Sequence, residues 1–130
     1  MASIRREVVL NATIDTVWDA LRDLGALHTR LVPGFVLDTR MEGDDARRVT
    51  FANGMVVREL ILDVNEEQRR VAWAAVDTPM THYNASFQLF DKGQGRTKGV
   101  WIADLLPHDA APDIAVMIEQ GLAAMKKKFG

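Results

Sequence analysis

A carboxylate on a strand-like segment is the first group in this chain that could do chemistry. Glu59 lies in "MVVRELILDV", and Arg47 lies upstream in "ARRVTF". A carboxylate in apolar surroundings can hold a ligand through water or act as a base. The structural alternative is an ion pair between Glu59 and Arg47 across a hairpin, since most perturbed carboxylates are not catalytic. Glu59 is therefore a candidate for binding and for catalysis, and both roles are compatible with the pair.

The hairpin register decides which side chains accompany Glu59. A two-residue turn at positions 53–54 would place Glu59 on the same face as Arg48. A three-residue loop, with Gly54 in the left-handed conformation, would instead place Glu59 with Arg47 and Phe51. A slip of one residue moves every side chain of a strand to the other face. Apolar side chains occur on both faces of the expected strand 55–64, so the alternation pattern alone leaves both registers open.

A tyrosine and a histidine are the other candidates for polar chemistry. The Tyr83 hydroxyl could donate to a ligand oxygen, or Tyr83 could be a core residue bonded to the backbone. His28, in "ALHTRLVPG", is the histidine best placed to act as a general base. No Asp, Ser or second His lies at a spacing that would build a triad with it. The catalytic candidates are therefore Glu59 and His28.

Metal and cofactor sites are not expected. The chain has no cysteine, and its three histidines, His28, His82 and His108, are scattered. Thiolate zinc sites and clustered imidazole ligands are thereby disfavoured. The "GQG" sequence lies between two strands, with no following helix to receive a phosphate. His82 is expected to face solvent.

Aromatic side chains recur on strand faces that should point toward the last helix. Trp73, Phe87 and Trp101 have matching parity, and Met117 and Gly121 lie one turn apart on that helix. A glycine inside a helix costs about 1 kcal/mol relative to alanine. Gly121 therefore either leaves room for a ligand or lets a tryptophan ring fill the space above it.

The elements that must position these residues follow a simple order: a strand, two short helices, six strands and a long helix. Thr13 and Pro112 mark the starts of the first and last helices. The short connections require antiparallel neighbours, and the last helix is the only element large enough to cover one face of the sheet. The fold class is therefore α+β. The expected strands are 4–12, 35–41, 46–51, 55–64, 69–76, 81–90 and 96–106, and the expected helices are 13–25, 26–34 and 109–129.

Length and charge limit the classes of protein. The 130 residues fit a single domain, 1–130. No apolar run approaches the roughly 18–20 residues of a membrane span, and the start resembles no signal peptide, so a cytoplasmic location is expected. A net charge of −2 argues against a nucleic-acid partner. The sequence does not predict the oligomeric state, a dimer being one option.

Six segments together resemble the START/SRPBCC superfamily, and most closely its polyketide cyclase/dehydrase and lipid-transport group. They are "NATIDTVWDAL", "VPGF", "ARRVTFANGMVVREL", "VNEEQRRVAW", "THYNASFQLF" and "GLAAMKKKF". The resemblance covers essentially the whole chain. It implies a helix-grip fold, in which a curved seven-stranded antiparallel sheet wraps around the C-terminal helix and leaves a ligand cavity between them. It does not imply one activity.

The resemblance also bears on individual residues. It favours the three-residue loop, because a glutamate at the position of Glu59 points into the family's cavity. It places Tyr83 after the "DTPM" loop, where family members close over the ligand, and it makes Trp18 structural. The face that carries Val71, Trp73, Tyr83 and Phe87 is expected to be cavity wall in its wide half and core in its narrow half. The predicted ligand-binding residues are Arg47, Phe51, Glu59, Trp73, Tyr83, Phe87, Trp101, Met117 and Gly121.

Three functions remain open at this stage. The first is binding of an apolar or aromatic small molecule, lipid-like or polyketide-like. The second is a cyclase or dehydrase in which Glu59 or His28 moves a proton and Tyr83 or Arg47 steadies an oxyanion. The third is a protein-interaction module whose pocket is filled by the tryptophans. The lack of an obvious acid–base pair favours binding over catalysis.

Overall fold

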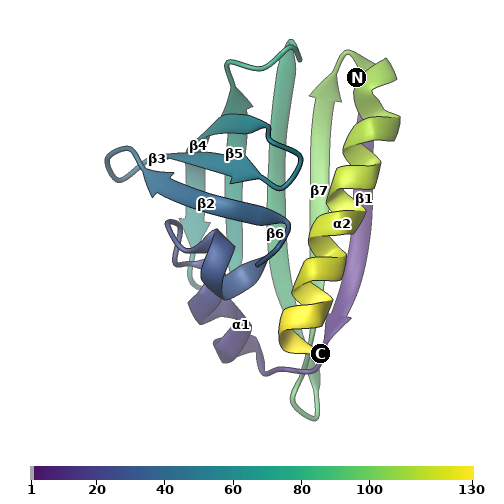
Figure 1. The fold of residues 1–130 in the computed structure, drawn as a ribbon. Coiled ribbons are helices and arrows are strands. Elements are labelled where there is room, and N and C mark those ends of the chain that lie inside the picture. Colours follow the sequence, from purple (N-terminus) through teal and green to yellow (C-terminus); the bar gives the residue numbers. More distant parts are fainter. Residues whose placement is uncertain (1) are drawn as a thin grey trace.

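The computed structural model describes residues 2–130 as one curved antiparallel sheet with a long helix lying along its inner face (Figure 1). The strand order is β1-β7-β6-β5-β4-β3-β2, so sequence neighbours pair except where β1 joins β7. The expected seven-stranded sheet is confirmed. The strands are β1 (Ala2–Leu10), β2 (Val36–Met41), β3 (Ala46–Phe51), β4 (Val56–Asn65), β5 (Arg70–Val76), β6 (His82–Gly93) and β7 (Arg96–Leu106).

Two short helices connect β1 to β2, as expected. The first, α1 (Ile14–Leu21), begins after Thr13, whose hydroxyl accepts a hydrogen bond from the Thr16 backbone N–H at 3.3 Å. It ends before the expected stop at residue 25, because the chain turns there and the backbone N–H of residue 26 bonds the carbonyl of residue 23 at 3.0 Å. The second, η1 (Leu27–Leu31), is a single π-helical turn.

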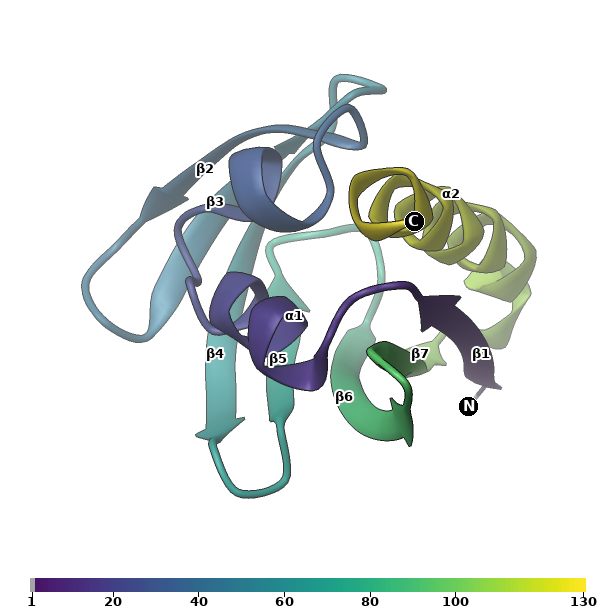
Figure 2. The same ribbon diagram turned by 90° about the horizontal axis from the view of Figure 1, so that it is seen from below.

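The chain closes with a 3-10 turn, η2 (His108–Ala110), and the long helix α2 (Ala111–Phe129). Pro112 lies in the first turn of α2, where its missing N–H leaves no helical bond unmade. Figure 2 shows the sheet bending from β1 and β7 round to β2, with α2 lying inside the curve. No helix within residues 2–130 is long and apolar enough to cross a membrane.

The β3–β4 hairpin has the three-residue loop. Arg47 pairs with Glu59 in the strand register, and the Phe51 N–H donates to the Met55 carbonyl at 2.8 Å. Gly54 has a φ of +91°, the left-handed conformation that this loop requires. The register therefore places Arg47 and Glu59 on the inner, concave face of the sheet.

The narrow half of the space between sheet and helix is solid core. Val71 on β5 pairs with Phe87 on β6, and each is 1% exposed. Ile118, Leu122 and Met125 bring the apolar stripe of α2 into the same cluster. Burial of such side chains is the main stabilising term for the fold. The wide half, toward β2, β3 and the β5–β6 loop, is hollow.

Candidate ligand-binding site

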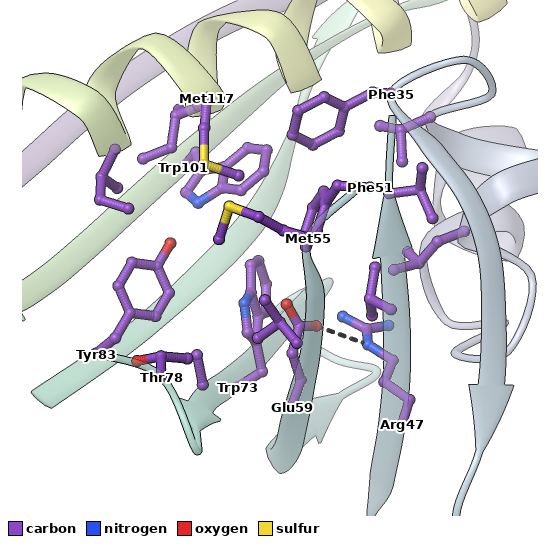
Figure 3. Close-up of a pocket in the computed structure, with 18 of the residues that line it drawn as sticks. Phe35, Arg47, Phe51, Met55, Glu59, Trp73, Thr78, Tyr83, Trp101 and Met117 are labelled. Atoms are coloured by element: carbon purple, nitrogen blue, oxygen red, sulfur yellow. Dashed lines mark hydrogen bonds and ion pairs between the residues drawn. The ribbon is translucent and has the colours of Figure 1, made fainter. Parts of the chain in front are cut away.

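A cavity of about 310 Å³ lies between the inner face of the sheet, η1 and α2 (Figure 3). This volume is at the lower end of the range for small-molecule sites. Most of its wall is apolar or aromatic. The lining residues are Leu21, Leu27, Leu31, Val32, Phe35, Val36, Arg47, Val49, Phe51, Met55, Val57, Glu59, Trp73, Ala75, Thr78, Pro79, Met80, Tyr83, Trp101, Ala110, Asp113, Ile114, Met117, Ile118 and Met125.

Three lining residues are exposed to solvent and show where the cavity reaches the surface. Met55 is 42% exposed and follows the β3–β4 loop. Pro79 lies in the β5–β6 loop, and Asp113 lies in the first turn of α2. These three segments therefore surround the opening.

A buried ion pair forms the charged part of the wall. Arg47 Nε donates to Glu59 Oε1 at 2.9 Å, and the side chains are only 4% and 9% exposed. Arg47 Nη1 also donates to the Leu24 carbonyl at 3.1 Å. The guanidinium lies 5.7 Å from the centre of the Trp73 ring, within cation–π range. Arg47 is thus held by three partners, and the pair exists as the sequence suggested.

The second carboxylate oxygen of Glu59 is available to a ligand. Glu59 Oε2 accepts no hydrogen bond from any residue between 2 and 130, and Figure 3 shows it turned away from Arg47. The arrangement therefore offers one strong acceptor to whatever enters the cavity.

Two pairs of aromatic rings form the walls. Trp73 and Trp101 meet edge to face, with ring centres 5.8 Å apart. Phe35 and Phe51 meet in the same way at 5.3 Å. Such pairs are favourable beyond the area they bury. Both indole rings line the cavity, so they border it instead of filling it.

Tyr83 presents its hydroxyl to this space. Burial raises the pKa of Tyr83, and the negative charge of Glu59 raises it further, while the indole N–H of Trp101 acts in the opposite direction. Figure 3 shows the hydroxyl pointing toward the indole nitrogen of Trp101. That buried nitrogen has no hydrogen-bond partner within the described chain. The Tyr83 hydroxyl and the Trp101 N–H therefore face each other on the cavity wall without a hydrogen bond of normal geometry at the indole nitrogen.

Two residues predicted to bind the ligand do not line the cavity. Phe87 lies behind Trp101, at 5.9 Å between ring centres, and packs so closely on Gly99 that a Cβ there would overlap its ring. At Gly121 a Cβ would lie 3.0 Å from a Trp101 ring carbon and 3.2 Å from a Phe35 ring carbon. Gly121 therefore admits two aromatic rings close to α2, which agrees with the second of the two alternatives that the sequence left open and not with a role in ligand binding.

His28 is not among the residues that line the cavity, so the structure does not bring it to Glu59. Its neighbours Leu27 and Leu31 turn inward from η1 and line the wall, whereas the His28 ring packs elsewhere with its Nδ1 buried and unpaired among residues 2–130. His82 is exposed, as expected, and bonds Asn84 Oδ1 at 2.6 Å. No histidine therefore joins Glu59 in the site.

Several lining residues were not predicted to bind a ligand. Met55 shares a face with Glu59, so the register itself pointed to it. Phe35 follows the turn at residues 33–34, and Met80 and Thr78 lie in the β5–β6 loop. No strand or helix periodicity extends into these turns. In the part of the chain that the structure describes, no group of His, Asp and Glu could hold a metal ion.

The curved sheet, the long helix inside it and the cavity between them define a helix-grip protein of the START/SRPBCC superfamily. The chain belongs to the family described as "Polyketide cyclase / dehydrase and lipid transport", whose model matches residues 1–130. A search of the curated proteins found no significant match.

Solved structures with the same fold come from several bacteria. The protein XoxI from Bacillus cereus has a TM-score of 0.88 at 17% identity, with 99% of this chain and 96% of that chain covered. The Zhui aromatase/cyclase from a Streptomyces species has a TM-score of 0.74 at 17% identity, with 98% and 90% covered. A START superfamily protein from Mycobacterium smegmatis has a TM-score of 0.72 at 14% identity, with 97% and 92% covered. At these identities the likeness establishes the fold alone.

Proposed function

We propose that this protein binds an apolar or aromatic small molecule, lipid-like or polyketide-like, in the cavity between the sheet and α2. The observation that carries the proposal is the cavity of about 310 Å³, whose wall is apolar except for a few placed polar groups. Ligand sites typically combine such a wall with a small number of polar atoms that fix orientation. Glu59, Tyr83 and Trp101 would supply that orientation here.

Binding is favoured over catalysis by the surroundings of Glu59. Histidine is the side chain that most often moves protons in acid–base catalysis. The partner of Glu59 is Arg47, at 2.9 Å, and His28 lies outside the cavity wall. A filled interaction module is disfavoured because the tryptophans leave the wide half open.

Titration with the neutral, polarity-sensitive fluorophore prodan tests the proposal. Ala75 lines the cavity, and Ala74 precedes it on β5 with its side chain on the opposite face. We expect the parent to bind prodan with a blue shift, Ala75→Phe to bind much more weakly, and Ala74→Phe to bind like the parent. Equal binding by the two variants, or none by the parent, would contradict the proposal.

A further inference from the structure

The charges that face the cavity are unbalanced. Among the described residues that line it, Arg47 is the cation, and Glu59 and Asp113 are the anions. Arg47 donates through Nε to Glu59 and through Nη1 to the Leu24 carbonyl, and its guanidinium also contacts the Trp73 ring. Glu59 therefore balances the charge of Arg47, and the lining within residues 2–130 carries one more anion than cation.

The free polar atoms in the cavity suit a neutral ligand. Glu59 Oε2 accepts no hydrogen bond within residues 2–130, so a ligand can donate to it. Trp101 Nε1 makes none in the same part of the chain, so it needs an acceptor. The Tyr83 hydroxyl can do either. Burial, followed by the charge of Glu59, raises the pKa of Tyr83, which keeps this hydroxyl protonated and indicates a negative potential beside it.

We infer that the cavity selects neutral ligands that carry a hydroxyl group and discriminates against ligands that carry a carboxylate, fatty acids included. The inference rests on the proposed function and names the class of ligand for that same site. A hydroxyl donates to Glu59 Oε2 and can accept from Trp101 or Tyr83. A carboxylate would lose its hydration and lie beside the charge of Glu59 with no unpaired cation to offset either effect.

Three probes of one shape test this selectivity: naphthalene, 2-naphthol and 2-naphthoate, titrated calorimetrically into the full chain at neutral pH. There the naphthol is neutral and the naphthoate is ionised. We expect 2-naphthol to bind several-fold more tightly than naphthalene, and roughly 100-fold more tightly than 2-naphthoate, because an unpaired buried charge is strongly disfavoured. If 2-naphthoate binds as tightly as 2-naphthol, the inference is overturned.

Variants locate the source of the selectivity. Glu59→Gln should improve binding of 2-naphthoate, since it removes the repelling charge and leaves Arg47 without a counter-charge. Because that change threatens folding, Arg47→Met with Glu59→Leu provides a second test, in which 2-naphthol should lose its advantage over naphthalene. Asp109→Asn, an exposed change outside the cavity, should keep the parental preference. A double variant with the parental preference would overturn the role of Glu59.

The outcomes also separate the two proposals. If naphthalene binds but 2-naphthol and 2-naphthoate bind equally well, the proposed function stands and the selectivity is refuted. If none of the three probes binds, the proposed function fails, and the selectivity fails with it.

Discussion

Arg47 and Glu59 face each other across the β3–β4 hairpin, with 2.9 Å between Nε and Oε1 and both side chains almost fully buried. The pair lies on the cavity wall and orients the buried carboxylate of Glu59 that faces the cavity. Removing either partner would leave a buried charge without compensation, which is far more costly than losing an exposed pair.

Glu59→Ala is expected to lower the free energy of unfolding by about 3–5 kcal/mol, because it leaves Arg47 charged and buried. Arg47→Met combined with Glu59→Leu should recover much of that loss. The control is Glu42→Ala, since Glu42 also pairs with arginines, Arg48 and Arg58, but on the exposed side. That change should cost at most about 1 kcal/mol. Urea unfolding measures all three, and a similar cost for Glu59→Ala and Glu42→Ala would contradict a structural role for the buried pair.

Gly121→Leu is expected to destabilise the protein by about 1–3 kcal/mol, because the rings of Trp101 and Phe35 already lie in contact distance of the missing Cβ. Ala123→Leu, on the exposed side of the same helix, should change stability by less than about 0.5 kcal/mol. Thermal melting of the two variants makes the comparison. A Gly121→Leu protein as stable as its parent would mean that the space above Gly121 is open after all.

Tyr83 should make stability depend on pH at the alkaline end. Burial, followed by the charge of Glu59, raises its pKa above the usual value of 10.0, so the folded protein keeps a proton that the unfolded chain releases. The contribution of Tyr83 to the free energy of unfolding is therefore fully present below about pH 10. Above that pH it falls by about 1.4 kcal/mol per pH unit. Tyr83→Phe should show a shallower decline in urea unfolding.

The same titration can be observed directly, because Tyr83 is the only tyrosine in the chain. The phenolate absorbance of the folded protein should appear only well above pH 10. An ordinary titration near 10 in the folded state would show that the hydroxyl is solvated.

Much of the fold could be predicted from the sequence, because the patterns that indicate strands, helices and turns involve residues that lie close together in the chain. Alternation along 69–76 and 81–90 fixed which side chains share a face, and Val71 and Phe87 do form core while Trp73 and Tyr83 line the cavity. The hairpin loop was less determined, since apolar residues occupy both faces of β4. The left-handed conformation of Gly54 settles it.

Depth within the molecule could not be predicted in this way. Alternation along a strand, or periodicity along a helix, assigns a residue to the inner face but does not say whether another ring lies in front of it. Phe87 and Gly121 were therefore placed at the site although Trp101 covers them. Residues in turns, such as Phe35 and Met80, were missed because the path of a turn depends on packing between distant segments.

The most direct test of ligand binding uses the three tryptophans as reporters. Trp73 and Trp101 line the cavity, whereas Trp18 is buried outside it with its indole N–H donating to Glu66 at 2.6 Å. A proton–nitrogen correlation spectrum resolves the indole N–H signals, and naphthalene serves as a neutral ligand that tests the cavity without its polar atoms. The account predicts that naphthalene shifts the signals of Trp73 and Trp101 and leaves that of Trp18 in place. Unchanged Trp73 and Trp101 signals, or an equal shift of Trp18, would contradict binding in this cavity.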